Sequence, residues 1–420
     1  MIRFIHAADA HIDSPLIGLE VHEGAPVDVL RGATRRAFEN LIQLAIDEHI
    51  DFLVIAGDLY DGDWKDYSTG LFFRRQMARL HDQAIPVYLI AGNHDAASVI
   101  SKKLSLPENV HVFSTRTTES VEVVGHPVVI HGRGFPNRAV PENLVLEYPA
   151  SVPNRFNIGL LHTSLTGRRF HDTYAPCSET DLRQKGYDYW ALGHIHQPEM
   201  ISQDPDPWIV FAGNCQGRDA REVGPHGCWM ITVNDSLDVE NVEWQDLDVV
   251  RWQVLEINLT GITEEPEALG RVTKAMASAV SAADGRLVAA RIVFTGATPL
   301  HGSLHREMHR WRAELLGRAQ DQGEDTIWIE RIKVATSPVY DLAQLAERDA
   351  LTKIVLETLE QARIEPGNLP DEIKEMLGIL PLEVRSEVEF DWDENQRVKT
   401  MEDVQAIILD AMGTKGGKSS

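Results

Sequence analysis

The stretch Ile2-Arg3-Phe4-Ile5-His6-Ala7-Ala8-Asp9-Ala10-His11 joins an apolar run to side chains that can bind a metal ion. The run over Ile2–Ala7 is short and almost continuous, which is typical of a strand buried on both faces of a sheet. Asp9 and His11 follow at the point where this strand would end. The same arrangement occurs four more times along the first half of the chain.

The later motifs also follow predicted strands. These strands are predicted at Phe52–Ala56, Val87–Ala91, Ile158–Leu161 and Tyr189–Leu192. The motifs after them are, in the same order, Gly57-Asp58, Gly92-Asn93-His94-Asp95, His162 and Gly193-His194-Ile195-His196. In α/β sheets, ligands bind in the crevice outside the carboxyl ends of the strands. We therefore expect the five motifs to converge in space.

Helical patterns alternate with the first strands. Amphipathic stretches over Val27–His49 and Lys65–His81 lie between them and predict βαβ units. Further strands are predicted at Val121–Val124, Val128–His131, Ile209–Ala212 and Trp229–Val233. This density of strands favours a second sheet packed on the first. Residues 1–247 are thus predicted to form a layered α/β sandwich.

The rest of the chain has a different pattern. Residues 248–340 are predicted to be a smaller α+β capping domain, with strands at Trp252–Leu259, Leu287–Phe294 and Thr326–Ala335 and helices at Glu267–Ala283 and Leu304–Arg318. Residues 341–420 are predicted to be a mostly helical region that ends in a flexible tail. His301, His305 and His309 do not form an H-E-x-x-H motif, so we predict that they lie on a solvated helix face.

The five motifs contain the side chains that hard to borderline metals prefer. Carboxylate, amide oxygen and imidazole suit Mn²⁺, Fe or Zn²⁺, and none of the motifs contains a thiolate. One carboxylate can bridge two cations roughly 3.5–4 Å apart, a spacing suited to phosphoryl displacement. Each motif is weak alone, because a Gly-Asp pair is usually a turn. Their order, placement and chemistry agree, and together they favour a two-metal phosphoesterase centre.

This series of motifs resembles the calcineurin-like metallophosphoesterase superfamily. The flanking stretches narrow the resemblance to bacterial DNA-repair exonucleases of the SbcD type, and especially to their YhaO-like branch. These stretches are Phe4–Pro15, Gly57-Asp58-Leu59-Tyr60-Asp61 and Gly213-Asn214-Cys215-Gln216-Gly217-Arg218. The motifs cover about residues 1–245, and beyond them the resemblance is in domain order and length.

The resemblance implies a role for each motif residue. One metal would be held by Asp9, His11, Asp58 and His196, and the other by Asp58, Asn93, His162 and His194. His94 would stabilise or protonate the leaving oxygen, and Asp95 would orient His94 through a carboxylate–imidazole hydrogen bond. Asp61 stands where some relatives carry an additional catalytic histidine, and Ala10 stands where leucine is usual.

Gln216 and Arg218 follow the predicted strand at Ile209–Ala212, near the same rim. We predict them as substrate-binding residues, with Arg218 contacting a phosphate. The alternative is a surface turn that ends at Gly217, and the sequence does not separate the two.

The predicted function is a two-metal-dependent DNA nuclease with Mn²⁺ as the expected metal. The resemblance implies a 3′-to-5′ exonuclease with single-strand endonuclease activity in DNA repair. It also implies a partner, an SbcC-like ATPase with a coiled coil that docks on the C-terminal helices. The apolar faces of these helices could instead pack within the chain or form a dimer contact.

Two alternative functions stay open. One is an esterase for small phosphates, which does not need the long C-terminal extension. The other is a non-catalytic DNA-end-binding subunit, which does not need His94.

Bulk composition sets further limits. The formal net charge of −24 disfavours non-specific adhesion to DNA, because phosphate contacts need Lys and Arg. It neither supports nor excludes DNA as a specific substrate, since bound divalent cations offset acidity at the site itself. Cys177, Cys215 and Cys228 form no C-x-x-C pair, which fits a reducing compartment. Without a recognisable leader or an apolar run of about 18 residues, a cytoplasmic protein with no membrane partner is expected.

Overall fold

The structure is a computed structural model that describes residues 1–14, 25–61, 67–97, 105–165, 174–203, 207–339, 353–354 and 356–358. It divides into two compact units, the first formed by Met1–Gln253 with Ala283–Ala289 and the second by Val254–Ala282 with the chain from Ala290 onward. Apart from five positions, the helical region predicted at 341–420 lies outside the described residues. The domain bounds at residues 247 and 340 stay predictions.

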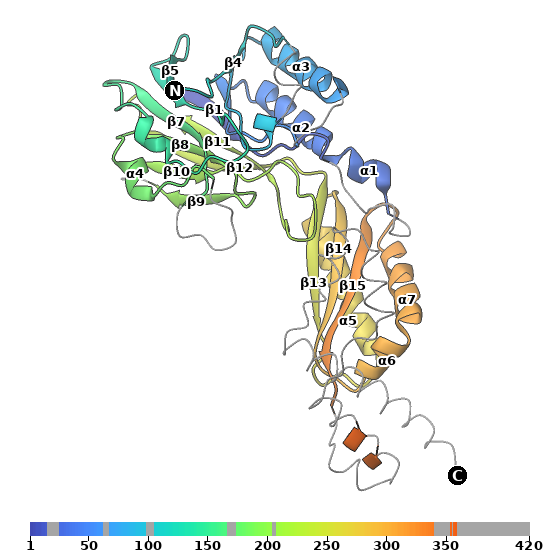
Figure 1. The fold of residues 1–420 in the computed structure, drawn as a ribbon. Helices are drawn as coiled ribbons and strands as arrows, with labels where there is room; N and C mark the ends of the chain where they lie inside the picture. Colours follow the sequence, from blue (N-terminus) through green and yellow to red (C-terminus); the bar gives the residue numbers. More distant parts are fainter. Residues whose placement is uncertain are drawn as a thin grey trace, which may run out of the picture. The chain divides into compact units, whose positions relative to one another are not determined.

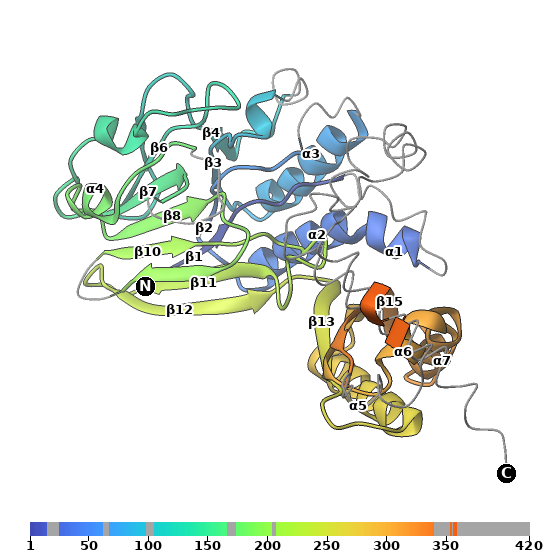
Figure 2. The same cartoon turned by 60° about the horizontal axis from the view of Figure 1, so that its bottom comes forward.

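Two six-stranded sheets form the first unit (Figures 1 and 2). One has the order β12-β11-β1-β2-β3-β4, with bounds Val239–Asp246, Gly227–Val233, Ile2–Ala7, Phe52–Ile55, Val87–Leu89 and Val110–Val112. The other has the order β5-β6-β7-β8-β10-β9, with bounds Glu119–Glu122, Val128–Gly132, Phe156–His162, Tyr189–Gly193, Trp208–Phe211 and Glu199–Ser202. Strands β1 to β4 run parallel to one another, as do β6, β7, β8 and β10.

The period of two along a strand explains why the sheets stack. Phe4 and Phe52 point into the space between the sheets, where their rings stack with centroids 4.9 Å apart. Ile5 and Leu53, the next residues in each strand, point to the opposite face. Both faces of the central strands are therefore buried, as the continuous apolar runs predict.

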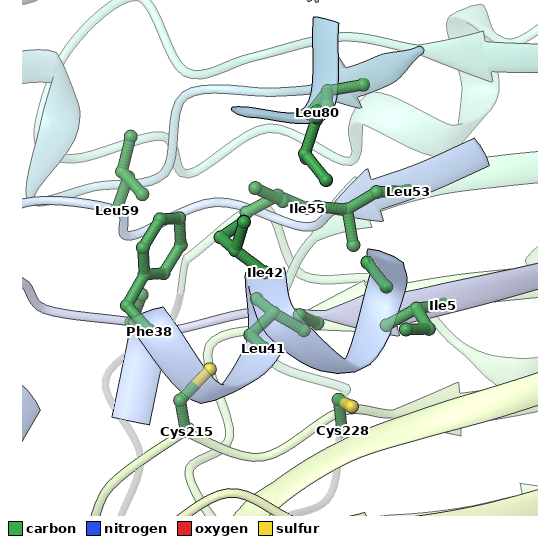
Figure 3. Packing of buried hydrophobic residues seen from close by; sticks show 14 of the residues in the cluster. Ile5, Phe38, Leu41, Ile42, Leu53, Ile55, Leu59, Leu80, Cys215 and Cys228 are labelled. Atoms are coloured by element: carbon green, nitrogen blue, oxygen red, sulfur yellow. The ribbon is translucent and has the colours of Figure 1, made fainter. Parts of the chain in front are cut away.

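Helices cover the outer faces of the two sheets. The first sheet is covered by α2 (Ala33–Asp47) and α3 (Tyr67–Asp82), and Figure 3 shows Phe38, Leu41 and Ile42 of α2 lying over its strands. The 3-10 helix η3 (Leu144–Glu147) and α4 (Glu179–Arg183) pack on the second sheet. The predicted layered α/β sandwich is confirmed. All three cysteines are buried and unpaired, with Cys215 and Cys228 facing α2.

The second unit is built on the three-stranded sheet β13-β14-β15, with bounds Val250–Asn258, Leu287–Ala297 and Ile327–Ser337. The first residues of β13 and β14, up to Gln253 and Ala289, are counted in the first unit. Its helices are α5 (Glu265–Ala282), α6 (His301–Arg306) and α7 (Met308–Gln320). Phe294 of β14 meets Trp311 of α7 edge to face, with ring centroids 5.9 Å apart. These elements follow the order predicted for an α+β unit.

Several local predictions are wrong. The helix predicted at Val27–His49 is two helices, α1 (Val27–Arg31) and α2, separated by Gly32. Glu307 likewise separates α6 from α7 within the predicted helix Leu304–Arg318. His301 is fully buried, and its Nδ1 lies 2.8 Å from the hydroxyl of Thr336, so it does not lie on a solvated face.

Three strands were not predicted from the sequence, namely β4, β9 and β12. β4 and β9 are three and four residues long, and most of their side chains are only partly buried, so they carry no clear apolar pattern. β12 is longer, but as an edge strand it also leaves its side chains partly exposed. No helix in the described part of the chain is both long enough and apolar enough to cross a membrane.

Candidate metal centre

The backbone brings the first two motifs side by side. Strands β1 and β2 are parallel neighbours, and their pairing continues past the strand ends. The amide of Asp9 donates to the carbonyl of Gly57 at 3.0 Å, and the amide of His11 donates to the carbonyl of Asp58 at 3.1 Å. Asp9, His11 and Asp58 are therefore presented at one edge of the sheet, as the strand-end positions predict.

Backbone strain is concentrated at these positions. Asp9, His11, Asp58 and His194 have φ angles of 48°, 39°, 50° and 97°, in the left-handed region that side chains disfavour. Such conformations cost of order 1–3 kcal/mol each and persist where the surrounding structure imposes them. Four strained residues in one cluster mark it as a functional site.

Glycine is required beside two of the motif residues. A Cβ atom on Gly92 would lie 2.2 Å from Oδ1 of Asp58, and one on Gly193 would lie 2.1 Å from the carbonyl oxygen of Ala56. No side chain fits at those distances. Gly92 thus allows two neighbouring loops of the first sheet to approach closely, and Gly193 allows the strand ends of the two sheets to do so.

The predicted ligands form two clusters. In the first, Asp9, His11 and His196 have ligand atoms within 4.8 Å of one another, with 3.2 Å between the two Nε2 atoms of His11 and His196. In the second, Asp58, His162 and His194 meet the same limit. Asn93 joins the second cluster, because its Oδ1 lies 2.8 Å from Nε2 of His162.

Asp58 faces both clusters. Its Oδ2 lies 3.4 Å from Nε2 of His162 in the second cluster and 4.0 Å from Nε2 of His11 in the first. Its other oxygen, Oδ1, accepts a hydrogen bond from the amide of His94 at 2.9 Å. Asp58 therefore has the position that a bridging carboxylate needs.

The residues present fit divalent cations. Oδ1 of Asp9 is buried and has no hydrogen-bond partner among the described residues. Nδ1 of His162 is 2.9 Å from the carbonyl of Ala56, and Nδ1 of His196 is 2.6 Å from Glu222, so each ring directs Nε2 into its cluster. Burying several hydrogen-bond acceptors side by side, with no donor between them, costs folding free energy unless a cation binds them. Oxygen and imidazole donors suit Mn²⁺, Fe or Zn²⁺.

Burial and neighbouring charges shift the pKa values of the carboxylates in the two clusters. Burial raises the pKa of Asp9 to about 6, although His162 and His196 oppose the shift. Burial also acts to raise the pKa of Asp58, but His162 and His11 outweigh it and hold that pKa below its ordinary value. The buried carboxylates thus depend on neighbouring positive charge, which a divalent cation would supply.

His94 lies beside the clusters and is paired with Asp61. Its Nδ1 is 2.8 Å from Oδ1 of Asp61, and its side chain is 27% exposed. The hydrogen bond that Nδ1 of His94 donates to Asp61 raises the pKa of His94. Oδ2 of Asp61 accepts a hydrogen bond from the hydroxyl of Ser14 at 2.6 Å, which fixes the carboxylate.

The role predicted for Asp95 is wrong. Its carboxylate does not contact His94 but accepts hydrogen bonds from the amides of Leu59, Tyr60 and Gly92, at 3.1, 2.8 and 3.1 Å. Asp95 begins the 3-10 helix η2 (Asp95–Ala97), and from there its side chain turns back to the two loops that carry Asp58 and Asn93. Asp95 therefore holds these loops together, and Asp61 is the carboxylate that pairs with His94.

Gln216 and Arg218 differ in their placement. Gln216 is 2% exposed, and its amide is fully used by backbone groups, donating to Gly217 and Val250 and accepting from Val249 and Val250. It is not available to a substrate, so that prediction is wrong.

Arg218 lies at the site, with Nη2 3.0 Å from Nδ1 of His196 and Nη1 3.8 Å from Oδ2 of Asp61. It does not lie in a plain surface turn, because its guanidinium is paired with Glu222 at 3.0 Å. Phosphate contact by Arg218 stays a prediction.

Glu222 was missed by the sequence analysis. It contacts His196, Asn214 and Arg218, yet it follows His196 by 26 residues. It stands among other charged residues in no recognisable motif, so no signal in the sequence pointed to it.

The clusters open into a cleft of about 530 Å³. Its lining includes motif residues together with Arg138, Tyr174, Gln197, Arg221, Glu222 and His226. The ring of Tyr174 meets that of His194 with centroids 5.1 Å apart. A substrate in this cleft would meet His94, an aromatic ring and arginine side chains around the two clusters.

Comparisons with known proteins agree with this geometry. Residues 2–198 match the family model described as calcineurin-like phosphoesterase, and residues 252–337 match the model described as metallophosphoesterase YhaO, middle domain. The uncharacterized metallophosphoesterase YhaO of Bacillus subtilis is 36% identical over 263 residues, which are 62% of this chain and 64% of that protein. The matched region thus spans just under two thirds of that relative's length.

More distant relatives carry a DNA-repair name. The DNA double-strand break repair protein Mre11 of Sulfurisphaera tokodaii is 24% identical over 63% of this chain and 67% of its own. Mre11 of Sulfolobus acidocaldarius is also 24% identical, over 64% of this chain and 69% of its own. A dimetal phosphatase from Danio rerio aligns with a TM-score of 0.36 and 9% identity, over 59% of this chain and 96% of its own. The two family-model matches identify residues 2–198 as a calcineurin-like phosphoesterase domain and residues 252–337 as a YhaO-type middle domain.

Proposed function

We propose that this protein is a metal-dependent phosphodiesterase that cleaves DNA. The observation that carries the proposal is the convergence of seven side chains from five strand ends into two adjoining clusters, with Asp58 facing both. One ion would be held by Asp9, His11, Asp58 and His196, and the other by Asp58, Asn93, His162 and His194. When bound, such ions neutralise phosphate charge and orient the reacting oxygens of an ester.

The remaining chemistry falls to His94. Because Asp61 accepts from Nδ1, the Nε2 atom of His94 is left to face the cleft and to donate a proton to the leaving oxygen. Asp61 fixes the ring, and Asp95 fixes the loops on which Asp58 and Asn93 stand. The chain thus supplies metal ligands, a proton donor and its support within one cleft.

DNA is proposed as the substrate because relatives over most of the matched region are named DNA double-strand break repair proteins. The cleft also offers Arg138, an exposed cation that lies close enough to His94 to affect it electrostatically. We further propose 3′-to-5′ exonuclease action with single-strand endonuclease activity, in the cytoplasm. Mn²⁺ is the proposed metal, since it accepts both oxygen and imidazole ligands.

One assay separates this function from an esterase for small phosphates. The protein is freed of metal, reloaded with Mn²⁺, and given linear duplex DNA labelled at either end, circular single-stranded DNA, and bis-nitrophenyl phosphate. We expect loss of mononucleotides from 3′ ends, nicking of the circle, and no turnover in EDTA. Cleavage of the small ester with inert DNA would overturn the nuclease proposal, and release from 5′ ends would overturn only the polarity.

The third possibility, a DNA-end-binding subunit without catalysis, makes a different prediction. Such a protein would shift labelled DNA in a gel with Mn²⁺ present, but would leave it uncut at any enzyme concentration. The set of ligands and the Asp61–His94 pair argue against this reading, because end binding needs neither.

Partner binding is proposed for the C-terminal region. We propose that residues 341–420 dock an SbcC-like ATPase with a coiled coil, with a homodimer contact as the alternative. The test compares the full chain with a chain ending at residue 340. Loss of ATPase binding, with Mn²⁺ stoichiometry unchanged, supports docking. A shift from dimer to monomer in light scattering supports the alternative.

A further inference from the structure

Glu222 is a nearly buried carboxylate at the edge of the metal clusters. Its side chain is 14% exposed, and it lines the cleft of the first unit. Oε1 lies 2.6 Å from Nδ1 of His196 and 3.0 Å from Nη2 of Arg218. Oε2 accepts from Nδ2 of Asn214 at 2.9 Å and from the amide of Arg218 at 2.8 Å. Both oxygens are therefore committed to residues around the site.

The first consequence concerns His196. A carboxylate at Nδ1 holds the proton on that nitrogen and leaves the lone pair on Nε2. Nε2 of His196 is the atom that meets His11 at 3.2 Å in the first cluster. A carboxylate behind a ligating histidine also makes the ring a stronger donor to a metal. Glu222 therefore keeps Nε2 of His196 unprotonated and makes it a stronger donor to a metal ion.

The second consequence concerns Arg218. Its guanidinium lies 3.0 Å from Nδ1 of His196, so a full positive charge stands directly beside a predicted ligand. Unbalanced, that charge would repel a cation in the first cluster. Glu222 accepts from the guanidinium and neutralises it. The same guanidinium lies 3.8 Å from Asp61, the partner of His94.

We propose that Glu222 is a positioning residue of the metal centre. It holds His196 with Nε2 directed into the first cluster, and it balances the charge of Arg218 beside that cluster. The inference rests on the metal centre proposed above, but it concerns the affinity of one cluster and not the activity of the protein. Glu222 has no contact with the second cluster's Asp58, His162 or His194 among the hydrogen bonds of the described residues.

In the test, Mn²⁺ is titrated into the metal-free full chain. Binding is measured by calorimetry and by the electron paramagnetic resonance signal of free Mn²⁺. Wild type is expected to bind two ions. Glu222→Gln is expected to bind one ion as wild type does and the other at least about 10-fold more weakly, the range seen when such carboxylate partners are lost. The Arg218→Gln/Glu222→Gln double variant is expected to recover part of that loss.

The matched control is Glu330→Gln, which also removes a nearly buried carboxylate paired with an arginine, at 2.7 Å from Arg291 in the second unit. It is expected to bind both ions with wild-type affinity. If Glu222→Gln does the same, and only its unfolding midpoint in EDTA falls, Glu222 is merely structural and the inference is overturned. Glu222→Asp, which keeps the charge but shortens the reach, serves the same test if the glutamine variant does not fold.

The outcomes also separate this inference from the proposed function. A wild-type chain that binds fewer than two ions overturns the metal centre and this inference with it. A wild-type chain that binds two ions, with no weaker site in Glu222→Gln, overturns this inference alone.

Discussion

Nδ1 of His94 lies 2.8 Å from Oδ1 of Asp61, and this pair stands beside both clusters without belonging to either predicted ligand set. Such an arrangement separates two tasks. The clusters can hold ions without His94, and His94 can be changed without removing a ligand.

The first prediction concerns His94 itself. Replacing His94 with Gln removes the proposed proton donor, and such a group typically contributes about 10²–10⁴-fold to a rate. We expect kcat for DNA cleavage to fall by that order, with two Mn²⁺ ions still bound as measured by elemental analysis. Unchanged cleavage would show that another group protonates the leaving oxygen.

The second prediction concerns Asp61. Asp61→Asn keeps the size of the side chain but removes the charge that fixes the His94 ring. We expect a smaller fall in kcat than for His94→Gln, with KM almost unchanged. The matched control is Asp51→Asn, which disrupts another Asp–His pair, at 3.4 Å from His126 and outside the site. Equal effects of the two variants on kcat would count against a role for Asp61.

The third prediction uses the contact between Gly92 and Asp58. In Gly92→Ala the added methyl group would meet Oδ1 of Asp58 at 2.2 Å, so the bridging carboxylate must move. We expect Mn²⁺ affinity to fall in both clusters, because Asp58 faces both. Gly270→Ala in helix α5, where a Cβ atom meets nothing within 4 Å, should leave Mn²⁺ binding unchanged. Wild-type Mn²⁺ affinity at both sites in Gly92→Ala would contradict this placement of Asp58.

The fourth prediction concerns stability and pH. Burial lowers the pKa of His6 to about 3, from an ordinary value of 6.5. Its ring contacts the hydroxyl of Tyr189 at 3.0 Å and the carbonyl of Leu192 at 3.2 Å. Below pH 6.5 the unfolded chain takes up a proton at this ring and the folded chain does not, so stability falls as the pH falls.

The expected size is up to about 1.4 kcal/mol per pH unit between roughly pH 6 and 4. Urea unfolding in EDTA at several pH values measures it. His6→Gln should show a shallower dependence than wild type, while His81→Gln, at a ring that is 53% exposed, serves as control. Identical slopes for wild type and His6→Gln would refute the assignment.

The strands and the ligands were predictable from the sequence because both depend on short-range pattern. β1 has the predicted bounds Ile2–Ala7, and continuous apolar runs marked the other central strands. Polar side chains at the ends of such strands converge by topology alone, which is why Asp9 and His162 could be placed together before any coordinates.

The contacts that support the ligands were not predictable, because they depend on side-chain direction and on distant loops. Asp95 follows His94 directly in the sequence, yet its carboxylate turns away to three backbone amides. Asp61 is 33 positions before His94 and becomes its partner. The side-chain oxygen of Gln216 likewise accepts hydrogen bonds from the amides of Val249 and Val250, which lie outside the motif around it.

Each cluster takes ligands from both sheets of the sandwich. Asp9 and Asp58 follow strands of the first sheet, whereas His162, His194 and His196 end or follow strands of the second. Any ion held there is therefore a cross-link between the two layers, and opening the sandwich requires its release. Loading the centre with metal should therefore slow global unfolding, and we expect the metal-bound form to be the most stable form of the protein.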